Sequence, residues 1–422
     1  MGRTEDKLVV VGQGYVGLPV AVAAAENGFD VTGFEVDPRK VKLLNAGTSY
    51  VEDITDERLQ GLIDAGVYRA SGDAADMEGF DICVISVPTP MGEGVPDLSY
   101  IESASAAVAP YITPGSTVIL ESTTYPGTTE ELSQPILEKG SGLRAGEDFH
   151  LGYSPERIDP GNQKYRLENT PKVVSGVDAA SLDKVKSFFD RLVEQTVPVS
   201  GTREAEMTKL LENTFRHVNI ALVNELAMFA NALGIDVWES IDAASTKPFG
   251  YMRFTPGPGV GGHCLPIDPS YLSWQVERVL GQTFRFVELA NDVNEHMPDY
   301  VVRRIQGMLN DRSRSVKGST VLIYGMAYKA NTGDARETPS RPVVEQLLEL
   351  GAEVLVADPH VDDHQMPAGA KRVDGTARDA ATADLVAYLV DHDAFDTEGI
   401  ESGETPVLDC RKALKGPRVE YL

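Results

Sequence analysis

The stretch with the clearest chemical potential is a loop rich in glycine and proline, residues 256–269, that holds a single cysteine, Cys264. Glycine lets the backbone pass close to a ligand, and proline stiffens the loop on either side. Most lone cysteines are small buried hydrophobic residues, and that interpretation stands as the alternative. The surrounding glycines favour a thiol held against a ligand, where a stabilised thiolate acts as a nucleophile.

A second motif lies near the start of the chain. A β-branched run at residues 7–11 leads into Gly12-Gln-Gly14-Tyr15-Val16-Gly17, then a helix over 18–27 and a strand over 31–35 that ends in Glu35. Strand, G-x-G-x-x-G, helix, strand and acid form the dinucleotide-binding fingerprint, although an isolated glycine motif is weak evidence. The helix N-terminus attracts the pyrophosphate. Glu35 would bind the ribose hydroxyls and repel a 2′-phosphate, so the motif predicts NAD rather than NADP.

Three more apolar runs read as strands that end in polar residues. They cover residues 81–88, 117–123 and 150–157, and their tips carry Pro88 with Thr89, Thr123, and Glu156 with Arg157. In open α/β sheets the ligand lies at the carboxyl ends of the strands. Thr123 and Glu156 are therefore candidate site residues, while a role as strand-end caps is the alternative for each.

The periodicity then changes to that of a long helix over residues 205–229, with Gly234 as its C-cap. Lys209 and Asn213 are four residues apart and share one face of this helix. Such a pair is usually solvated surface. After the cysteine loop, Asp268 and Pro269 resemble an N-cap and first residue of a helix over 270–279.

From residue 319 a βα pattern resumes, with strands over 319–325, 353–358, 384–390 and 406–409. We therefore predict an α/β chain with two doubly wound, Rossmann-like domains joined by a long central helix and a helical middle domain. The expected bounds are 1–200 for the NAD-binding domain, 201–310 for the helical middle domain with the cysteine loop, and 311–422 for the second Rossmann-like domain.

Composition narrows the class of protein. The chain has 422 residues, three cysteines and a formal net charge of −26, from 64 acidic and 38 basic residues. The sparse cysteines fit neither a disulfide framework nor a CxxC metal site, so we expect a cytoplasmic protein without a metal. The negative charge argues against nucleic acid, and no apolar run is long enough for a membrane span. Such acidity fits a halophile, where salt screens the self-repulsion.

Taken together, the motifs resemble those of the nucleotide-sugar 6-dehydrogenases, the UDP-glucose/GDP-mannose dehydrogenase family. The likeness covers nearly the whole chain. Its seven markers occur in the family's order: the motif at 12–17, Val87-Pro-Thr-Pro90, Glu121-Ser-Thr123, Ser154-Pro-Glu156, Lys209-x-x-x-Asn213, Gly261-Gly-His-Cys264 with Pro266 and Asp268, and Gly325-x-Ala-Tyr-Lys329.

The resemblance implies a four-electron oxidation of C6 of a UDP-sugar, with two NAD molecules used in turn. Cys264 would trap the aldehyde as a thiohemiacetal, which becomes a thioester and is hydrolysed. Lys209 and Asn213 would stabilise charge on the C6 oxygen, and Asp268, Glu156 and Thr123 would position water or relay protons. The further residues implied are Lys40 for the cofactor and, for the substrate, Arg157, Gly261, Lys329, Arg411 and Arg253, the last of which could come from a partner subunit.

The substrate follows from the residues after the Pro-Glu pair. The stretch that starts Pro155-Glu-Arg157 looks like the branch of the family that oxidises N-acetylated sugars, and arginine offers donors to an acetamido carbonyl. Thr246-Lys-Pro-Phe-Gly250 and Pro256-Gly-Pro-Gly259 look like UDP-N-acetylglucosamine 6-dehydrogenases in particular. We predict UDP-N-acetylglucosamine, with UDP-glucose and UDP-N-acetylmannosamine as alternatives. The resemblance also implies a homodimer through the central helix and a place in polysaccharide biosynthesis. The rival classes are a two-electron alcohol dehydrogenase and a non-catalytic NAD-binding protein.

Overall fold

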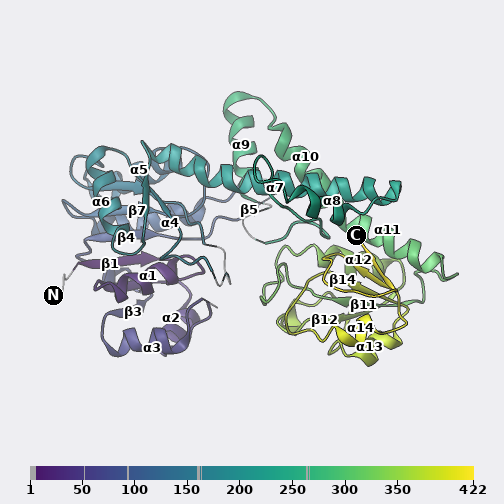
Figure 1. The fold of residues 1–422 in the computed structure, drawn as a ribbon. Helices are drawn as coiled ribbons and strands as arrows, with labels where there is room; N and C mark the ends of the chain where they lie inside the picture. Colours follow the sequence, from purple (N-terminus) through teal and green to yellow (C-terminus); the bar gives the residue numbers. More distant parts are fainter. Residues whose placement is uncertain are drawn as a thin grey trace. The chain divides into compact units, whose positions relative to one another are not determined.

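The computed structural model describes residues 6–422, apart from 52, 93–94, 159–161, 163, 263–264 and 266. The chain divides into two compact units, Met1–Glu212 and Asn213–Leu422. Each unit is built on its own sheet, and Figure 1 shows both.

The first unit contains an eight-stranded sheet in the order β10-β9-β8-β7-β4-β1-β2-β3. Neighbouring strands are parallel except at the β8–β9 junction, which is antiparallel. The carboxyl ends of β8, β7, β4, β1, β2 and β3 therefore meet at one edge, and β9 begins at that edge. The strands are β1 (Lys7–Val11), β2 (Asp30–Phe34), β3 (Tyr68–Ser71), β4 (Ile82–Ile85), β7 (Thr117–Leu120), β8 (His150–Tyr153), β9 (Lys172–Gly176) and β10 (Thr196–Pro198).

Helices cover both faces of this sheet because alternate strand residues point to opposite sides. Leu8 and Val10 of β1 join a core with residues of α1, α3 and α6. Val9 and Val11 join a second core with residues of α4 and α5. The helices are α1 (Gly17–Glu26), α2 (Pro38–Asn45), α3 (Asp56–Asp64), α4 (Ser99–Val108), α5 (Gln134–Ser141) and α6 (Ala179–Phe189), and a short ribbon pairs β5 (Met91–Gly92) with β6 (Val95–Pro96).

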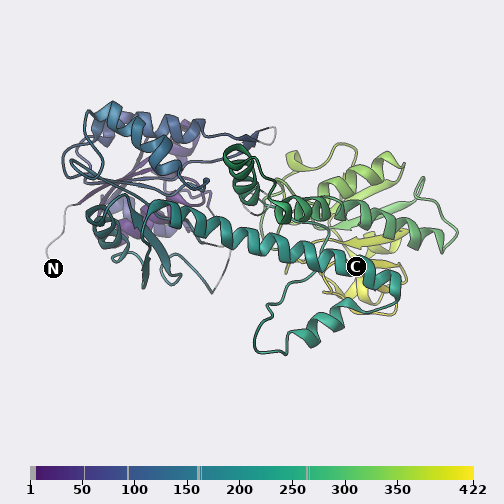
Figure 2. The same cartoon turned by 90° about the horizontal axis from the view of Figure 1, so that it is seen from above.

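The helix α7 (Thr202–Leu233) runs through the boundary between the units and is continuous in Figure 2. It ends at Gly234, whose φ of 68° suits glycine, as expected from the sequence. The helices α8 (Val237–Ala244), α9 (Asp268–Leu280), α10 (Arg285–Glu295) and α11 (Met297–Asn310) follow. The predicted N-cap of α9 is wrong: Ile267 is the N-cap, and Asp268 is already the first helical residue. Asp268 points its carboxylate at Asn213 instead.

The second sheet has six parallel strands in the order β13-β12-β11-β14-β15-β16. Val321 and Ile323 of β11 pack with α11 and α12, whereas Leu322 and Tyr324 pack on the opposite face. The strands are β11 (Thr320–Tyr324), β12 (Glu353–Ala357), β13 (Lys371–Arg372), β14 (Leu385–Tyr388), β15 (Val407–Asp409) and β16 (Val419–Tyr421), and the helices are α12 (Ser340–Glu349), α13 (Ala377–Thr382) and α14 (Glu398–Glu401). The predicted fold class, α/β with two Rossmann-like sheets and a helical middle, is confirmed.

Candidate active site

The glycine motif forms the turn between β1 and α1, and two of its glycines are required by close backbone contacts. Gly12 has φ of 89°, and a Cβ placed there would lie 2.3 Å from the carbonyl oxygen of Ser86. A Cβ on Gly17 would lie 1.9 Å from the carbonyl oxygen of Gly12. At Gly14 a Cβ would meet no heavy atom within 4 Å. The open space at Gly14 fits the close approach of a dinucleotide pyrophosphate.

Glu35 follows directly after β2 and is 8% exposed. Its two carboxylate oxygens accept hydrogen bonds from the backbone N–H groups of Gln13, at 3.2 Å, and Asp37, at 3.0 Å. Lys40 lies 3.9 Å from the same carboxylate and 5.3 Å from the ring centroid of Tyr50. This fixed carboxylate beside the glycine turn fits the ribose-binding role predicted for Glu35, with Lys40 next to it.

The tips of β4 and β7 meet beside the glycine turn, because β4 lies between β1 and β7 in the sheet. The hydroxyl of Ser122 accepts from the N–H of Val87 at 2.9 Å and donates to its carbonyl oxygen at 2.8 Å. This pair of bonds holds the start of the segment that carries Pro88 and Thr89. Thr123 is half-buried at the tip of β7. The predicted cofactor residues therefore share one edge of the first sheet.

A buried ionic cluster lies at the same edge. The ammonium of Lys172 forms salt bridges with Glu121 and, at 2.8 Å, with Glu156, and all three side chains are less than 10% exposed. The other oxygen of Glu156 accepts from the N–H groups of Arg157 and Ile158, both at 2.5 Å. Burial opposes ionisation of Glu156, but Lys172 and these donors outweigh it and lower its pKa. Burial raises the pKa of Glu121 to about 7.

Lys209 and Asn213 lie on successive turns of α7, and each contacts another predicted catalytic residue. Lys209 is 8% exposed and donates from Nζ to the carbonyl oxygen of Glu156 at 2.6 Å. Within the second unit, Asn213 donates from Nδ2 to Asp268 at 2.5 Å. The interpretation of this pair as solvated surface is therefore not what the structure shows. Both side chains are held by hydrogen bonds with defined partners.

Arg157, predicted to recognise the acetamido group, is bound to protein groups in this structure. Its guanidinium forms a salt bridge with Glu212 at 2.6 Å and donates to the carbonyl oxygen of Pro171 at 2.6 Å. The side chain is 27% exposed. These contacts fix the plane of the guanidinium and leave part of it accessible.

Two glycines of the cysteine loop pack against the segment between β11 and α12. A Cβ on Gly261 would lie 2.8 Å from the carbonyl oxygen of Glu337, and one on Gly262 would lie 2.8 Å from the ring of Tyr328. Only glycine fits these approaches, which confines the loop next to Lys329. Cys264 itself, with His263 and Pro266, lies outside the described residues.

A chain of buried polar side chains fixes the helices around this loop. Asn224 of α7 accepts from the N–H of Gly257 and donates to Asn294 of α10, both at 2.9 Å. His217, also on α7, bonds to Asn291 at 2.8 Å. Burial lowers the pKa of His217, so its ring favours the neutral form. The start of the loop is thus tied to α7 and α10 through the buried amides of Asn224 and Asn294.

The predicted basic substrate residues occupy different places in the second unit. Arg411 follows β15, donates from Nε to the carbonyl oxygen of Leu389 at 2.7 Å, and lies against Gly257, where a Cβ would be 3.0 Å from its guanidinium. Lys329 is half-buried in the segment after β11. Arg253 is 43% exposed and forms a salt bridge with Asp242 at 2.6 Å. Arg411 and the cysteine loop are therefore brought together, whereas Arg253 is held by Asp242.

Three family models match successive parts of the chain. They are the NAD binding domain of the UDP-glucose/GDP-mannose dehydrogenase family over residues 6–193, its central domain over 203–296 and its UDP binding domain over 322–416. The chain belongs to the UDP-glucose/GDP-mannose dehydrogenase family. It is an NAD-dependent nucleotide-sugar dehydrogenase with a UDP-sugar substrate, so the family, the cofactor and the enzyme class predicted from the sequence are confirmed.

Named relatives match this dehydrogenase along almost its whole length. The UDP-N-acetyl-D-mannosamine dehydrogenase of Pyrococcus horikoshii is 33% identical over 422 residues, which cover 99% of this chain and 98% of the relative. The UDP-N-acetyl-D-glucosamine 6-dehydrogenase of Pseudomonas aeruginosa is 36% identical over 419 residues, with coverage of 98% and 96%. The solved structure of the UDP-D-ManNAc dehydrogenase from Pyrococcus horikoshii superposes with a TM-score of 0.89 at 33% identity, with coverage of 99% and 98%.

Sequence reasoning missed two members of the buried cluster of this dehydrogenase, Glu121 and Lys172. Glu121 was visible as part of a family marker, but no role was given to it. Lys172 lies 51 residues from Glu121 and 16 from Glu156, so no local spacing indicates it. The available signal was a lysine directly before two valines in a short strand, where a buried charge requires a partner.

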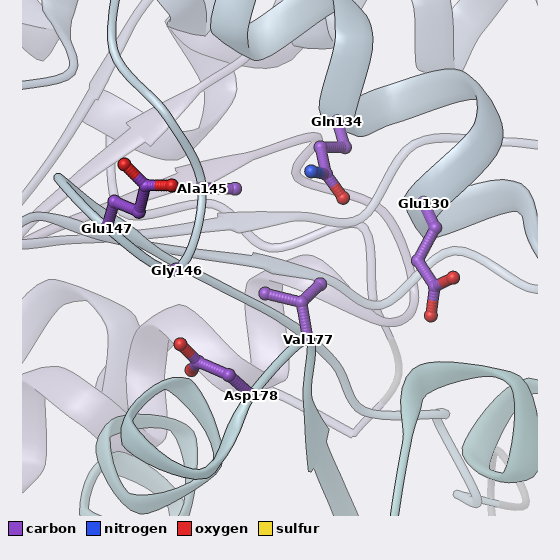
Figure 3. A pocket seen from close by; sticks show the side chains of 7 residues that line it. All are labelled: Glu130, Gln134, Ala145, Gly146, Glu147, Val177 and Asp178. Atoms are coloured by element: carbon purple, nitrogen blue, oxygen red, sulfur yellow. The ribbon is translucent and has the colours of Figure 1, made fainter.

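An acidic hollow elsewhere on the first unit of the dehydrogenase is separate from these strand tips. Figure 3 shows the carboxylates of Glu130, Glu147 and Asp178 around it. Glu147 precedes β8 and Asp178 follows the antiparallel β9, so this part of the lining lies at the opposite edge of the sheet from Glu35. A ring of carboxylates does not suit the phosphates of NAD or UDP. Within the described ranges, no helix is long and apolar enough to cross a membrane.

Proposed function

We propose that this dehydrogenase oxidises C6 of a UDP-N-acetylhexosamine to the carboxylate in two successive NAD-dependent steps, with UDP-N-acetylglucosamine as the substrate. The observation that carries the proposal is that Lys209 and Asn213, on successive turns of α7, are hydrogen-bonded to Glu156 and Asp268. Four of the six predicted catalytic residues thus form two hydrogen-bonded pairs, Lys209 with Glu156 and Asn213 with Asp268. This arrangement supports a chain whose catalytic positions are intact, rather than a non-catalytic NAD-binding protein.

The residues have distinct roles in the proposed reaction. NAD, when bound at the glycine motif, supplies hydride acceptance. Lys209 carries the positive charge that stabilises an oxyanion at C6, and Asn213 offers amide donors for the same purpose. Cys264 adds to the aldehyde carbon, which gives a thiohemiacetal and, after the second oxidation, a thioester. Glu156, ionised at neutral pH, accepts a proton from the water that hydrolyses the thioester.

The substrate assignment is supported by named relatives with N-acetylated substrates. The relatives from Pyrococcus horikoshii and Pseudomonas aeruginosa are named for UDP-N-acetyl-D-mannosamine and UDP-N-acetyl-D-glucosamine. UDP-N-acetylmannosamine is therefore the second candidate, and UDP-glucose is disfavoured. Arg157 is proposed to donate to the acetamido carbonyl with the part of its guanidinium that Glu212 and Pro171 leave accessible.

A panel of UDP-sugars tests the proposal. The purified enzyme is incubated with NAD and UDP-N-acetylglucosamine, UDP-N-acetylmannosamine, UDP-N-acetylgalactosamine or UDP-glucose, and products are identified by mass. We expect two NADH per carboxylate, and the highest kcat/KM for UDP-N-acetylglucosamine. One NADH per product would indicate a two-electron alcohol dehydrogenase. A higher kcat/KM for UDP-glucose would refute the assignment to N-acetylated sugars.

Replacement of the thiol tests the covalent step. Cys264→Ala should abolish carboxylate formation while NAD binding persists, because the glycine motif lies in the other unit of the chain. Cys83→Ala is the matched control, since Cys83 is a fully buried core residue of β4. Full turnover by Cys264→Ala would contradict the thioester mechanism and leave the cofactor assignment intact.

A homodimer through α7 is part of the same proposal. The exposed side of the helix carries apolar residues at intervals of three, four and seven, and they are 45–72% exposed: Phe215, Leu222, Leu226, Phe229 and Leu233. An apolar stripe of this kind suits burial against a second copy. Light scattering should give a dimer for the wild type, and Leu222→Glu with Leu226→Glu should give a monomer. A monomeric wild type would contradict this part of the proposal.

The remaining assignments follow from composition and family. We propose three domains, 1–200, 201–310 and 311–422, in a cytoplasmic enzyme of polysaccharide biosynthesis from a halophile. The charge of −26 supports the last point, because molar salt screens repulsion between acidic residues. The unfolding temperature should rise between dilute buffer and molar KCl, and a fall would rule out adaptation to high salt.

A further inference from the structure

The buried cluster of Glu121, Lys172 and Glu156 is assembled by the one antiparallel junction in the described part of the first sheet. Glu121 comes directly after β7, and Glu156 follows β8 by three residues. Because β9 runs against β8, its first residue, Lys172, lies at the edge where β7 and β8 end. The topology thus inserts one ammonium group between two carboxylates. The aromatic face of Phe189, 5.1 Å from the ammonium, adds a further contact.

The cluster has one more acid than base. With both carboxylates ionised it carries a net charge of −1 in a region where Glu121 is 1% and Lys172 is 2% exposed. An uncompensated buried charge is unfavourable, so the cluster favours uptake of one proton. The charges that face Glu121 are those of Lys172 and Glu156, and Lys209 is the next charge along, at the carbonyl of Glu156.

The hydrogen bonds decide which carboxyl group takes the proton. Glu156 accepts from Lys172 and from two backbone N–H groups. Glu121 accepts from Lys172 alone among the described residues, and its second oxygen is buried with no partner there. Burial raises the pKa of Glu121 to about 7, whereas Lys172 and the backbone donors lower that of Glu156. At neutral pH Glu121 is therefore poised between its two forms.

We propose that Glu121 is the proton acceptor behind Glu156, reached through Lys172, during hydrolysis of the thioester. The step rests on the proposed function of Glu156 and Cys264. The oxygen of water bonds to C6 while one of its O–H bonds breaks, and that proton passes to Glu156. The bond between C6 and Sγ of Cys264 then breaks, the thiolate leaves, and the new carboxylic acid releases its remaining proton to solvent. Lys172 transfers an N–H proton to Glu121 and receives the proton from Glu156. The cluster ends with a Glu121 carboxylic acid, a Lys172 ammonium and a Glu156 carboxylate, and Glu121 must release its proton before the next turnover.

This role distinguishes Glu121 from a group that only fills space. A structural carboxyl group has no reason to be ionised before each turnover. A proton acceptor must be ionised, so hydrolysis should accelerate as pH rises through the titration of Glu121 and level off above it. Glu121 does not touch substrate in this scheme and is a positioning and proton-accepting residue behind Glu156.

The test measures decay of the Cys264 thioester by acid quench and intact-protein mass spectrometry from about pH 5.5 to about pH 9. We expect the rate of thioester hydrolysis by the wild type to rise with pH around pH 7 and then level off, and we call this rise the limb. Glu121→Gln should remove that limb, match the wild type at about pH 6, and be about 10-fold slower or worse above about pH 8. Glu206→Gln is the matched control, because Glu206 is also buried with its pKa raised to about 7, but it binds the loop at Gly127 and Thr129.

The different results separate this inference from the mechanism on which it rests. A limb that persists in Glu121→Gln, or one lost equally in Glu206→Gln, overturns the role of Glu121. If Glu121→Gln fails to fold, Lys172→Arg provides the second test, since it keeps the charge but holds its protons too tightly to pass them on. Lys172→Arg should be folded and slow above about pH 8, and an unchanged rate overturns the relay. Carboxylate formation by Cys264→Ala would instead overturn the thioester mechanism itself.

Discussion

Replacing Gly14 with alanine is expected to weaken NAD binding without unfolding the first unit. A methyl group at Gly14 meets no heavy atom within 4 Å, and Gly14 is not among the glycines with positive φ. The protein itself therefore tolerates the methyl group. In dinucleotide sites this second glycine is where the backbone approaches the pyrophosphate, so the methyl group occupies space that the ligand needs. We expect Kd for NAD to rise at least tenfold, which corresponds to about 1.4 kcal/mol.

Gly17→Ala is the matched control, because it makes the same chemical change where the protein has no room. Its Cβ would lie 1.9 Å from the carbonyl oxygen of Gly12 and 3.3 Å from a side-chain carbon of Val10. A backbone oxygen moves only if the turn moves. Overpacking of this kind costs about 1–3 kcal/mol. At about 2–4 °C per kcal/mol for a unit of this size, Tm should fall by about 2–12 °C.

Thermal unfolding without ligand and calorimetric titration with NAD separate the two effects. The expected pattern is a near-native Tm with weak binding for Gly14→Ala, and a lowered Tm for Gly17→Ala. Equal losses of Tm in the two variants would show that the open space at Gly14 is not real. An unchanged Kd in Gly14→Ala would show that the pyrophosphate does not lie there.

Three further predictions concern the cofactor choice, the loop and the pH dependence of stability. Glu35→Ser should reduce the ratio of kcat/KM for NAD over NADP by about tenfold or more, because the carboxylate repels a 2′-phosphate, and an unchanged ratio would contradict its role. Asn224→Ala leaves the buried N–H of Gly257 without its acceptor and should lower the free energy of unfolding in urea by about 1–3 kcal/mol. The half-buried Asn219→Ala should change it far less, so equal effects would argue against the buried bond. Burial raises the pKa of Glu206 from 4.5 to about 7, so between these values the folded state keeps a proton that the unfolded chain releases. The titration of Glu206 should lower the free energy of unfolding by about 3 kcal/mol as pH rises through this window, and Glu121 contributes a further fall of its own. In urea titrations at about pH 5 and about pH 8, Glu206→Gln should therefore show a fall smaller than that of the wild type by about 3 kcal/mol.

The local sequence pattern was sufficient to predict the strands and the helix that position the cofactor. The β-branched run before Gly12, the glycine motif and the acid at the end of the next strand all depend on residues within about 30 positions, where period and turn chemistry are informative. The long helix was equally visible from its apolar period. The structure extends it to residues 202–233, beyond the predicted 205–229.

Contacts between distant residues were beyond this reasoning. Asp268 carries every sign of an N-cap, since an acid precedes proline before an apolar period, yet its carboxylate bonds to Asn213, 55 residues earlier. The bond to an amide on another helix competes with the local cap, and only the tertiary structure shows which prevails. Lys172 was missed for the same reason. The alternation of side chains along β9 is the same whether the strand runs parallel or antiparallel to β8, so the sequence does not show that Lys172 lies at the edge with Glu121 and Glu156.

The distribution of polar residues on α7 gives the strongest argument that this helix organises the predicted catalytic residues. Ordinarily a helix buries its apolar side and exposes its polar side. On α7 a polar row at intervals of three, four and seven is buried or half-buried, and every member has a hydrogen-bonded partner: Glu206, Lys209, Asn213, His217 and Asn224. An apolar row is exposed instead. Desolvating so many polar groups is unfavourable unless each is satisfied, so the partners fix the rotation of the helix about its axis. A shift of one residue would break all five sets of bonds together, and for this reason Lys209 and Asn213 are held in register with Glu156 and Asp268.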